Sequence, residues 1–189
     1  MTTDGPCRVA LVGMMGSGKS TIGRLLSEAT GWHYVDNDEL VRRAHGTTAR
    51  ALLADRGEQT MRRAESDALA LGLELPPPAI IGVAGGVILD PTDRQRLRAG
   101  AIVVWLRADA AVLESRAVGA EHRPWLDAGA ASWMRRAVAE RDPLYASVAD
   151  LVLDTATGAP AVAAATLHER LMAETPCGAS RSVRSRERA

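Results

Sequence analysis

Lys19 is the only lysine in a chain of 189 residues, and every other basic side chain among its 23 Lys and Arg residues is an arginine. An ammonium group is a compact point charge on a flexible stem, whereas a guanidinium group is a planar fork. Lys19 lies in the segment Gly13–Ser20, which reads GMMGSGKS and fits the pattern G-x-x-x-x-G-K-[ST] at every fixed position. The pattern predicts a loop that binds phosphate groups.

Each part of this loop has a predicted role in binding a nucleotide. Glycines let successive backbone N–H groups converge on anionic oxygens, and the start of the following helix adds a favourable dipole. Lys19 would neutralise charge on the β- and γ-phosphates, and the Ser20 hydroxyl would bind Mg²⁺, which prefers oxygen ligands. The predicted nucleotide-binding residues belong to the loop and the start of the helix: Gly13, Gly16, Ser17, Gly18, Lys19, Ser20 and Thr21.

Two carboxylates follow the next apolar segment, as Asp36 and Asp38 on either side of Asn37. In an extended segment residues i and i+2 project to the same side, so both side chains can face the phosphate loop. We predict that Asp36 holds Mg²⁺ through a bound water. Asp38 is predicted to accept a hydrogen bond, and then the proton, from the hydroxyl that attacks the phosphate. An alternative is that Asp36 or Asn37 caps the helix expected from about residue 39.

The elements that must position these residues are short apolar segments that alternate with longer helical patterns. Strands are predicted at 8–12, 33–35, 79–83, 101–106 and 151–153, and helices at about 21–28, 37–73, 91–99, 109–117, 129–146 and 159–173. Together with the phosphate loop, this alternation predicts a three-layer α/β/α P-loop fold, in which helices cover both faces of a five-stranded parallel sheet. Ligands of such sheets bind at the carboxyl ends of the strands, where the loop and both aspartates fall.

Length and composition fit a single domain, which we place at residues 1–174 of this 20.0 kDa chain. The Arg- and Ser-rich segment 175–189 lacks apolar periodicity and is predicted to be a disordered tail. The formal net charge is zero, and no apolar run approaches the ~18 residues that span a bilayer. We therefore expect a cytoplasmic monomer that binds a small molecule, with neither nucleic acid nor a membrane as partner.

Further motifs resemble those of the shikimate kinase family in their order and spacing. Besides the phosphate loop they are Asp36-Asn37-Asp38, Gly57–Glu65 (GEQTMRRAE), Gly85-Gly86, Arg123-Pro124 and Arg141–Tyr145 (RDPLY), and the similarity spans about residues 8–173. The resemblance implies ATP-dependent phosphorylation of the 3-hydroxyl of shikimate. The products would be shikimate 3-phosphate and ADP, in a step toward the aromatic amino acids.

An anionic, polyhydroxylated acceptor needs guanidinium groups, which can meet a carboxylate with two parallel hydrogen bonds. Arg62 and Arg141 are the candidates, and in the resembled family these positions grip the substrate carboxylate. Arg62 falls in a substrate-binding region expected at about 37–66, and Gly85-Gly86 would let the backbone approach the acceptor ring. The alternative for Arg62 is an ion pair on the helix surface with Glu58 or Glu65.

A polar segment between Gly119 and Gly129 is predicted to be a lid, at about residues 118–129. Its closure would exclude water and bring Arg123 onto the transferring phosphoryl group, as a catalytic residue beside Lys19 and Asp38. Arg116, just before this segment, matches a family position whose guanidinium covers the adenine. Stacking on a base suits arginine.

Four positions depart from the family pattern. Met61 stands where a phenylalanine is common, Ala84 where a third glycine is usual, Trp125 where a smaller aliphatic residue is usual, and Thr157 where a second arginine often contacts adenine. The departures at Met61, Ala84 and Trp125 leave an alternative open, which is a kinase of another small hydroxy acid, such as gluconate, or of a carbocyclic polyol. A more distant alternative is a non-catalytic regulatory module that binds a nucleotide.

Overall fold

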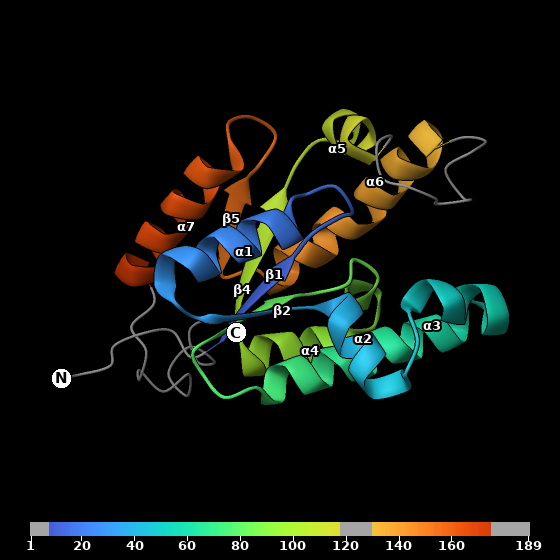
Figure 1. Cartoon of the computed structure of the whole chain (residues 1–189). Coiled ribbons are helices and arrows are strands. Elements are labelled where there is room, and N and C mark those ends of the chain that lie inside the picture. Colours follow the sequence, from blue (N-terminus) through green and yellow to red (C-terminus); the bar gives the residue numbers. More distant parts are fainter. Residues whose placement is uncertain (1–7, 118–129, 175–189) are drawn as a thin grey trace, which may run out of the picture.

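The computed structural model of the chain describes residues 8–117 and 130–174. Five parallel strands form one sheet in the order β2-β3-β1-β4-β5 (Figure 1). The strands are β1 (Arg8–Val12), β2 (His33–Asp36), β3 (Ala79–Gly82), β4 (Ile102–Arg107) and β5 (Leu151–Asp154). The prediction of a five-stranded parallel sheet is confirmed, with β1 at its centre.

Helices cover both faces of this sheet, as predicted for a three-layer fold (Figure 1). α1 (Lys19–Thr30) and α7 (Pro160–Glu174) pack together on one face. The other face is covered by α3 (Ala49–Glu74), α4 (Pro91–Gly100) and α6 (Ala130–Val148). Two shorter helices, α2 (Asn37–His45) and α5 (Ala110–Ala117), pack against α3 and α6, and a 3-10 turn, η1 (Val87–Leu89), precedes α4.

Successive side chains of each strand point to opposite faces, and both faces are buried. Along β1, Val9 and Leu11 pack with α1 and α7, whereas Ala10 and Val12 pack with the helices of the other face. None of these four side chains is more than 2% exposed. Polar groups that bind a ligand therefore have to lie at the ends of the strands rather than on the sheet.

The single helix predicted at about 37–73 is wrong, because two helices occupy this range. Gly46 ends α2 with a φ of +67°, and the Thr48 side chain accepts a hydrogen bond from the Ala51 N–H over 3.1 Å at the start of α3. A kink at Gly57, where φ is +80°, then redirects α3 just before the segment that carries Arg62. Helical propensity is continuous through this range, but a glycine and an N-cap threonine interrupt the hydrogen-bond ladder.

Within the described ranges, no helix has the length and apolar character needed to cross a bilayer. The segment predicted to be a lid, 118–129, and the segment predicted to be a tail, 175–189, lie outside the described residues. The extent of a single domain over residues 1–174 stays a prediction.

Candidate active site

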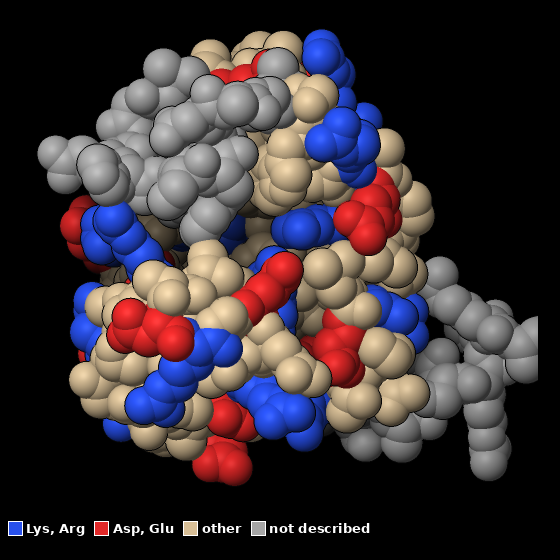
Figure 2. Space-filling model, turned by 90° about the vertical axis from the view of Figure 1, so that its right-hand side faces the viewer, with Lys and Arg blue, Asp and Glu red and all other residues tan. Residues whose placement is uncertain are grey.

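A cavity of about 870 Å³ lies at the carboxyl edge of the sheet, where β1, β2 and β3 end. Figure 2 shows a face of the molecule that is hollowed near its centre, with Lys and Arg side chains inside the hollow. The cavity brings together most of the predicted site residues: Gly16, Ser17, Gly18, Lys19, Ser20, Thr21, Asp36, Asp38, Arg62, Gly85, Gly86, Arg116 and Arg141. Gly13 is buried beneath this lining.

The phosphate loop is a tight turn between β1 and α1. Gly13 has a φ of +143°, and a Cβ at this position would lie 2.5 Å from the carbonyl oxygen of Leu106, so the close approach to β4 requires glycine. The Lys19 Nζ donates hydrogen bonds to the carbonyl oxygens of Gly13 and Met14, each over 2.9 Å. The amine is thus held against the loop and lines the cavity.

Ser20 and Asp36 are joined directly, because the Ser20 hydroxyl donates to the Asp36 Oδ2 over 2.8 Å. The Tyr34 hydroxyl donates to the same oxygen, also over 2.8 Å. The second carboxylate oxygen, Oδ1, accepts a hydrogen bond from the Asp38 N–H over 3.2 Å, so Asp36 is also the N-cap of α2. Capping and a place in the site, which the sequence offered as alternatives, are therefore combined in one side chain.

The environment of Asp36 keeps it ionised. Burial opposes its negative charge, but hydrogen bonds from Tyr34, Ser20 and the Asp38 N–H, together with the charge of Lys19, outweigh burial and hold the pKa of Asp36 below its usual value. Burial and the neighbouring carboxylate raise the pKa of the Tyr34 hydroxyl, which keeps its proton and acts as a donor. Oxygen atoms of Ser20 and Asp36 are the kind of ligand that suits Mg²⁺.

Asp38 lines the cavity, but it does not project from an extended segment as predicted. It belongs to the first turn of α2 rather than to an extended segment, and its side chain is exposed. The prediction that Asp36 and Asp38 both project from one extended segment is therefore wrong, because the chain turns into a helix directly after Asp36. Both carboxylates nevertheless line the same cavity.

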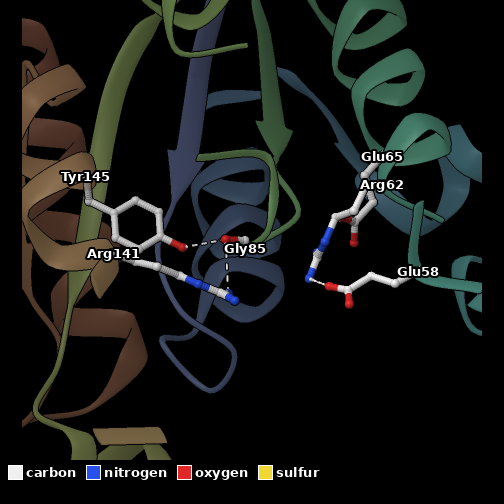
Figure 3. A network of polar contacts seen from close by, with 6 residues as sticks. All are labelled: Glu58, Arg62, Glu65, Gly85, Arg141 and Tyr145. Carbon is white, nitrogen blue, oxygen red and sulfur yellow. Dashed lines mark hydrogen bonds and ion pairs between the residues drawn. The ribbon is translucent and has the colours of Figure 1, made fainter. Parts of the chain in front are cut away.

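Arg62 is held by two acidic side chains of its own helix (Figure 3). Its Nη1 donates to Glu65 over 2.8 Å and its Nη2 donates to Glu58 over 3.0 Å. Burial raises the pKa of Glu65 and outweighs the opposing effect of the Arg62 charge. The ion pairs that the sequence offered as an alternative are present, and Arg62 lines the cavity as well.

Arg141 lies opposite, on α6, and its surroundings differ from those of Arg62 (Figure 3). Its residue is only 9% exposed, and its guanidinium lies over the Trp133 ring at 5.8 Å from the ring centroid. Its Nη1 reaches the Gly85 carbonyl oxygen at 3.5 Å, whereas its Nε has no hydrogen-bond partner in the part of the chain that the structure describes. No carboxylate within residues 8–117 and 130–174 forms an ion pair with Arg141. Its charge is therefore available to an anionic ligand.

Arg116 bridges three segments at the other side of the phosphate loop. Its Nη2 donates to the carbonyl oxygen of Thr155 over 2.6 Å, and its Nη1 reaches that of Gly16 at 3.4 Å. Thr155 follows β5, and its hydroxyl lies within hydrogen-bond distance of the carbonyl oxygens of Ser17, at 3.1 Å, and Arg107, at 3.0 Å. Arg116, Thr155 and Thr157 all line the cavity beside the loop.

The sequence did not predict the contacts of Tyr34 and Thr155. The proximity of Tyr34 to Asp36 could have been predicted, because Tyr34 lies two residues before Asp36 in a strand and its side chain therefore projects to the same side. Thr155 makes contacts more than 45 residues away along the chain, which no local pattern encodes. Arg123, predicted to be catalytic, and Trp125 lie outside the described residues.

The fold and the site together define a P-loop kinase. A glycine loop with Lys19 follows the central strand, and two further cationic side chains, Arg62 and Arg141, line the same cavity. Solved structures share this architecture. A shikimate kinase from Acinetobacter baumannii, solved in complex with shikimate, is similar with a TM-score of 0.84 and 28% identity, over 90% of this chain and 95% of that one. A gluconokinase from Sinorhizobium meliloti, at 20% identity and a TM-score of 0.53, shares the fold over 90% of this chain and 98% of that one.

Sequence comparison gives the family. The family model described as shikimate kinase matches residues 15–172. A shikimate kinase from Oleidesulfovibrio alaskensis is 39% identical over 160 residues, which are 82% of this chain and 92% of the relative. One from Paramagnetospirillum magneticum is 37% identical over 153 residues, which are 80% of this chain and 77% of the relative. The chain belongs to the shikimate kinase family.

Proposed function

We propose that this protein transfers the γ-phosphoryl group of ATP to the 3-hydroxyl of shikimate, giving shikimate 3-phosphate and ADP. The observation that carries this proposal is the content of one cavity. The phosphate loop with Lys19, the Asp36–Asp38 segment, and the arginines Arg62 and Arg141 all line it. A nucleotide and an anionic acceptor can therefore bind side by side, which is the arrangement that direct phosphoryl transfer needs.

The nucleotide would occupy the side of the cavity formed by the phosphate loop and Arg116. Backbone N–H groups of the loop and the N-terminus of α1 suit the phosphates, and the Lys19 amine would turn from the carbonyl oxygens of Gly13 and Met14 to the terminal phosphates. The Arg116 guanidinium, held over the backbone of the β5–α7 connection, suits stacking on adenine.

The Ser20–Asp36 pair fits a Mg²⁺ ion by its chemistry and by its position. Both side chains supply oxygen atoms at the edge of the phosphate loop, and Asp36 is held as a carboxylate. We propose that Ser20 binds the ion and that Asp36 holds it through water, since Mg²⁺ usually keeps several waters. When bound, the ion would neutralise part of the phosphate charge.

The acceptor would lie between Arg62 and Arg141, with its carboxylate on the guanidinium groups. Arg141 offers a buried cation without an acidic partner among the described residues, which a carboxylate would neutralise. Arg62 is already oriented by Glu58 and Glu65, so it loses little freedom when it binds the acceptor. The backbone of Gly85-Gly86 forms the wall between them.

Asp38 is the proposed acceptor for the proton of the attacking hydroxyl. It is exposed, lies in the first turn of α2 and lines the same cavity. Phosphoryl transfer proceeds with little covalent participation by protein groups, so catalysis rests on positioning and charge neutralisation. A role for Arg123 in that neutralisation stays a prediction, as do a cytoplasmic location and a monomeric state.

The test is the release of ADP, measured by a coupled spectrophotometric assay with shikimate, with gluconate and without an acceptor. We expect ADP release that depends on shikimate and is at most marginal with gluconate. Release that is equal with and without shikimate would indicate a nucleotide hydrolase or a regulatory module. Preference for gluconate would assign the chain to the kinases of other hydroxy acids.

A further inference from the structure

The Gly85–Gly86 turn touches both halves of the cavity. A Cβ at Gly85 would lie 3.3 Å from the Gly13 carbonyl oxygen and 3.9 Å from the Met15 N, so this residue packs against the phosphate loop. A Cβ at Gly86 would lie only 1.6 Å from the Arg62 Nη1, so this residue packs directly against the acceptor arginine. The turn is therefore in contact with the phosphate loop on one side and with the proposed acceptor arginine on the other.

A buried tyrosine, Tyr145 of α6, holds this turn (Figure 3). Its hydroxyl donates to the Gly85 carbonyl oxygen over 2.9 Å, and its residue is 1% exposed. The ring stacks on Trp105 of β4, with centroids 5.9 Å apart and planes inclined by 23°. Since Trp105 is paired in register with Val12, the last residue of β1, the tyrosine is fixed to the sheet directly beneath the phosphate loop.

The bond to Gly85 also orients the next backbone N–H. The peptide between Gly85 and Gly86 is trans, so its C=O and N–H point in opposite directions. With the carbonyl turned to Tyr145, the Gly86 N–H is turned away from α6, and it has no partner within residues 8–117 and 130–174. Gly86 lines the cavity, so its N–H is a donor that is free for the acceptor.

Arg141 contributes less to this arrangement than Tyr145. Its Nη1 lies 3.5 Å from the same carbonyl oxygen, at the limit of a hydrogen bond, and this group is the one expected to bind the acceptor carboxylate. Tyr145 keeps its proton, because burial raises the pKa of its hydroxyl. Its hydroxyl is therefore the strong and constant donor to Gly85.

We propose that Tyr145 is a positioning residue for the acceptor site, whose hydroxyl fixes the Gly85–Gly86 peptide so that the Gly86 N–H is presented to a hydroxyl or carboxylate oxygen of the acceptor. This inference rests on the proposed function, because it assigns a partner to that same site. Without the hydroxyl, the peptide can rotate and the Gly86 donor loses its fixed direction.

The test compares Tyr145→Phe with Ser27→Ala. The phenylalanine keeps the ring on Trp105 and removes only the hydroxyl. Ser27 provides a matched control, because its hydroxyl also donates to a backbone carbonyl, that of Trp32, over 2.6 Å, at the far end of α1. Each variant loses the hydrogen bond to its backbone carbonyl, and thermal melts followed by circular dichroism should show similar, small decreases in Tm.

The kinetic constants separate a positioning role from a structural one. We expect Tyr145→Phe to raise the KM for shikimate, and its Kd in calorimetric titrations with ADP present, about five- to tenfold, as for the loss of one hydrogen bond. The KM for ATP should stay within about twofold, and Ser27→Ala should change neither constant. An active wild-type protein with unchanged shikimate constants in Tyr145→Phe would overturn this inference alone. A wild-type protein without shikimate-dependent ADP release would overturn the proposed function and this inference with it.

Discussion

The Ser20 hydroxyl donates a hydrogen bond to the Asp36 Oδ2 over 2.8 Å. Ser20 follows the central strand β1, and Asp36 ends β2, with β3 between the two strands. The Tyr34 hydroxyl donates to the same oxygen, also over 2.8 Å. The two residues proposed to hold Mg²⁺ are therefore brought together by contacts of the chain itself.

Gly23, in the middle of α1, packs against the ring of Tyr34, the residue that donates to the Asp36 carboxylate. A Cβ at Gly23 would lie 2.3 Å from the Tyr34 ring. Alanine in a helix usually stabilises by about 1 kcal/mol relative to glycine. Here we predict the opposite sign, a decrease in the free energy of unfolding of about 1–3 kcal/mol for Gly23→Ala, because the site is already filled. Urea denaturation of the single variant and of Gly23→Ala/Tyr34→Leu measures it. The second change should restore much of the loss, and a Gly23→Ala protein more stable than wild type would contradict the packing described.

Arg62 and its neighbour Arg63 lie on α3, and their substitution by alanine gives a matched pair of variants. Arg62 lines the cavity between Glu58 and Glu65, whereas Arg63 is exposed. We predict that Arg62→Ala raises the KM for shikimate about 10- to 100-fold, the loss expected for charge-assisted hydrogen bonds, with a much smaller effect on the KM for ATP. Arg63→Ala should leave both constants near those of the wild type. Equal effects of the two substitutions in steady-state kinetics would exclude Arg62 from the acceptor site.

Glu65 predicts a pH dependence of stability. Burial raises its pKa in the folded protein above the value of about 4.3 expected when the chain is unfolded. The folded state then binds the proton more tightly, so the contribution of Glu65 to stability is largest below about pH 4 and falls as the pH rises through the raised pKa. In urea denaturation from pH 4 to 7, wild type should lose stability relative to Glu65→Gln as the pH rises. If the difference in the free energy of unfolding between wild type and Glu65→Gln stays constant, or changes in the opposite direction, burial does not outweigh the effect of the Arg62 charge on the pKa of Glu65.

Trp133 is expected to act through Arg141. Its ring lies against the guanidinium at 5.8 Å and lines the cavity. We predict that Trp133→Leu raises the KM for shikimate about two- to tenfold, consistent with the energy of a partly buried cation–π contact. Trp32→Leu, a change of the same kind at the far end of α1, should not alter this constant. Steady-state kinetics of both variants distinguish a contact with Arg141 from a general loss of stability.

The parts of the site that were predictable are those in which a local pattern has one physical meaning. The glycine loop around Lys19 is such a pattern, because its residue types follow from the close approach of backbone to an anion. The five strands were also predictable, since buried parallel strands are continuous apolar runs bounded by turn residues. Gly46 and Thr48 indicate the break between α2 and α3, but the helical propensity of the flanking residues led to the prediction of one continuous helix.

The contacts that complete the site depend on tertiary packing instead. Tyr145 lies 60 residues from Gly85 along the chain, and Thr155 lies 138 residues from Ser17. Neither pair follows from spacing or composition, because the fold alone brings α6 and the end of β5 to the loops after β3 and β1. Asp36 shows a third case, because the same side chain caps α2 and lines the cavity, so the two alternatives read from the sequence do not exclude each other.

The identity of the phosphorylated product decides whether this protein transfers a phosphoryl group to the 3-hydroxyl of shikimate. Shikimate labelled with ¹³C should be incubated with ATP, Mg²⁺ and wild-type protein, and the mixture examined by ³¹P and ¹³C NMR. We predict one new phosphomonoester whose phosphorus couples to carbon 3 of shikimate, and no such signal with Lys19→Met. Inorganic phosphate as the only product, a phosphoryl group on another hydroxyl, or full activity in Lys19→Met would contradict it.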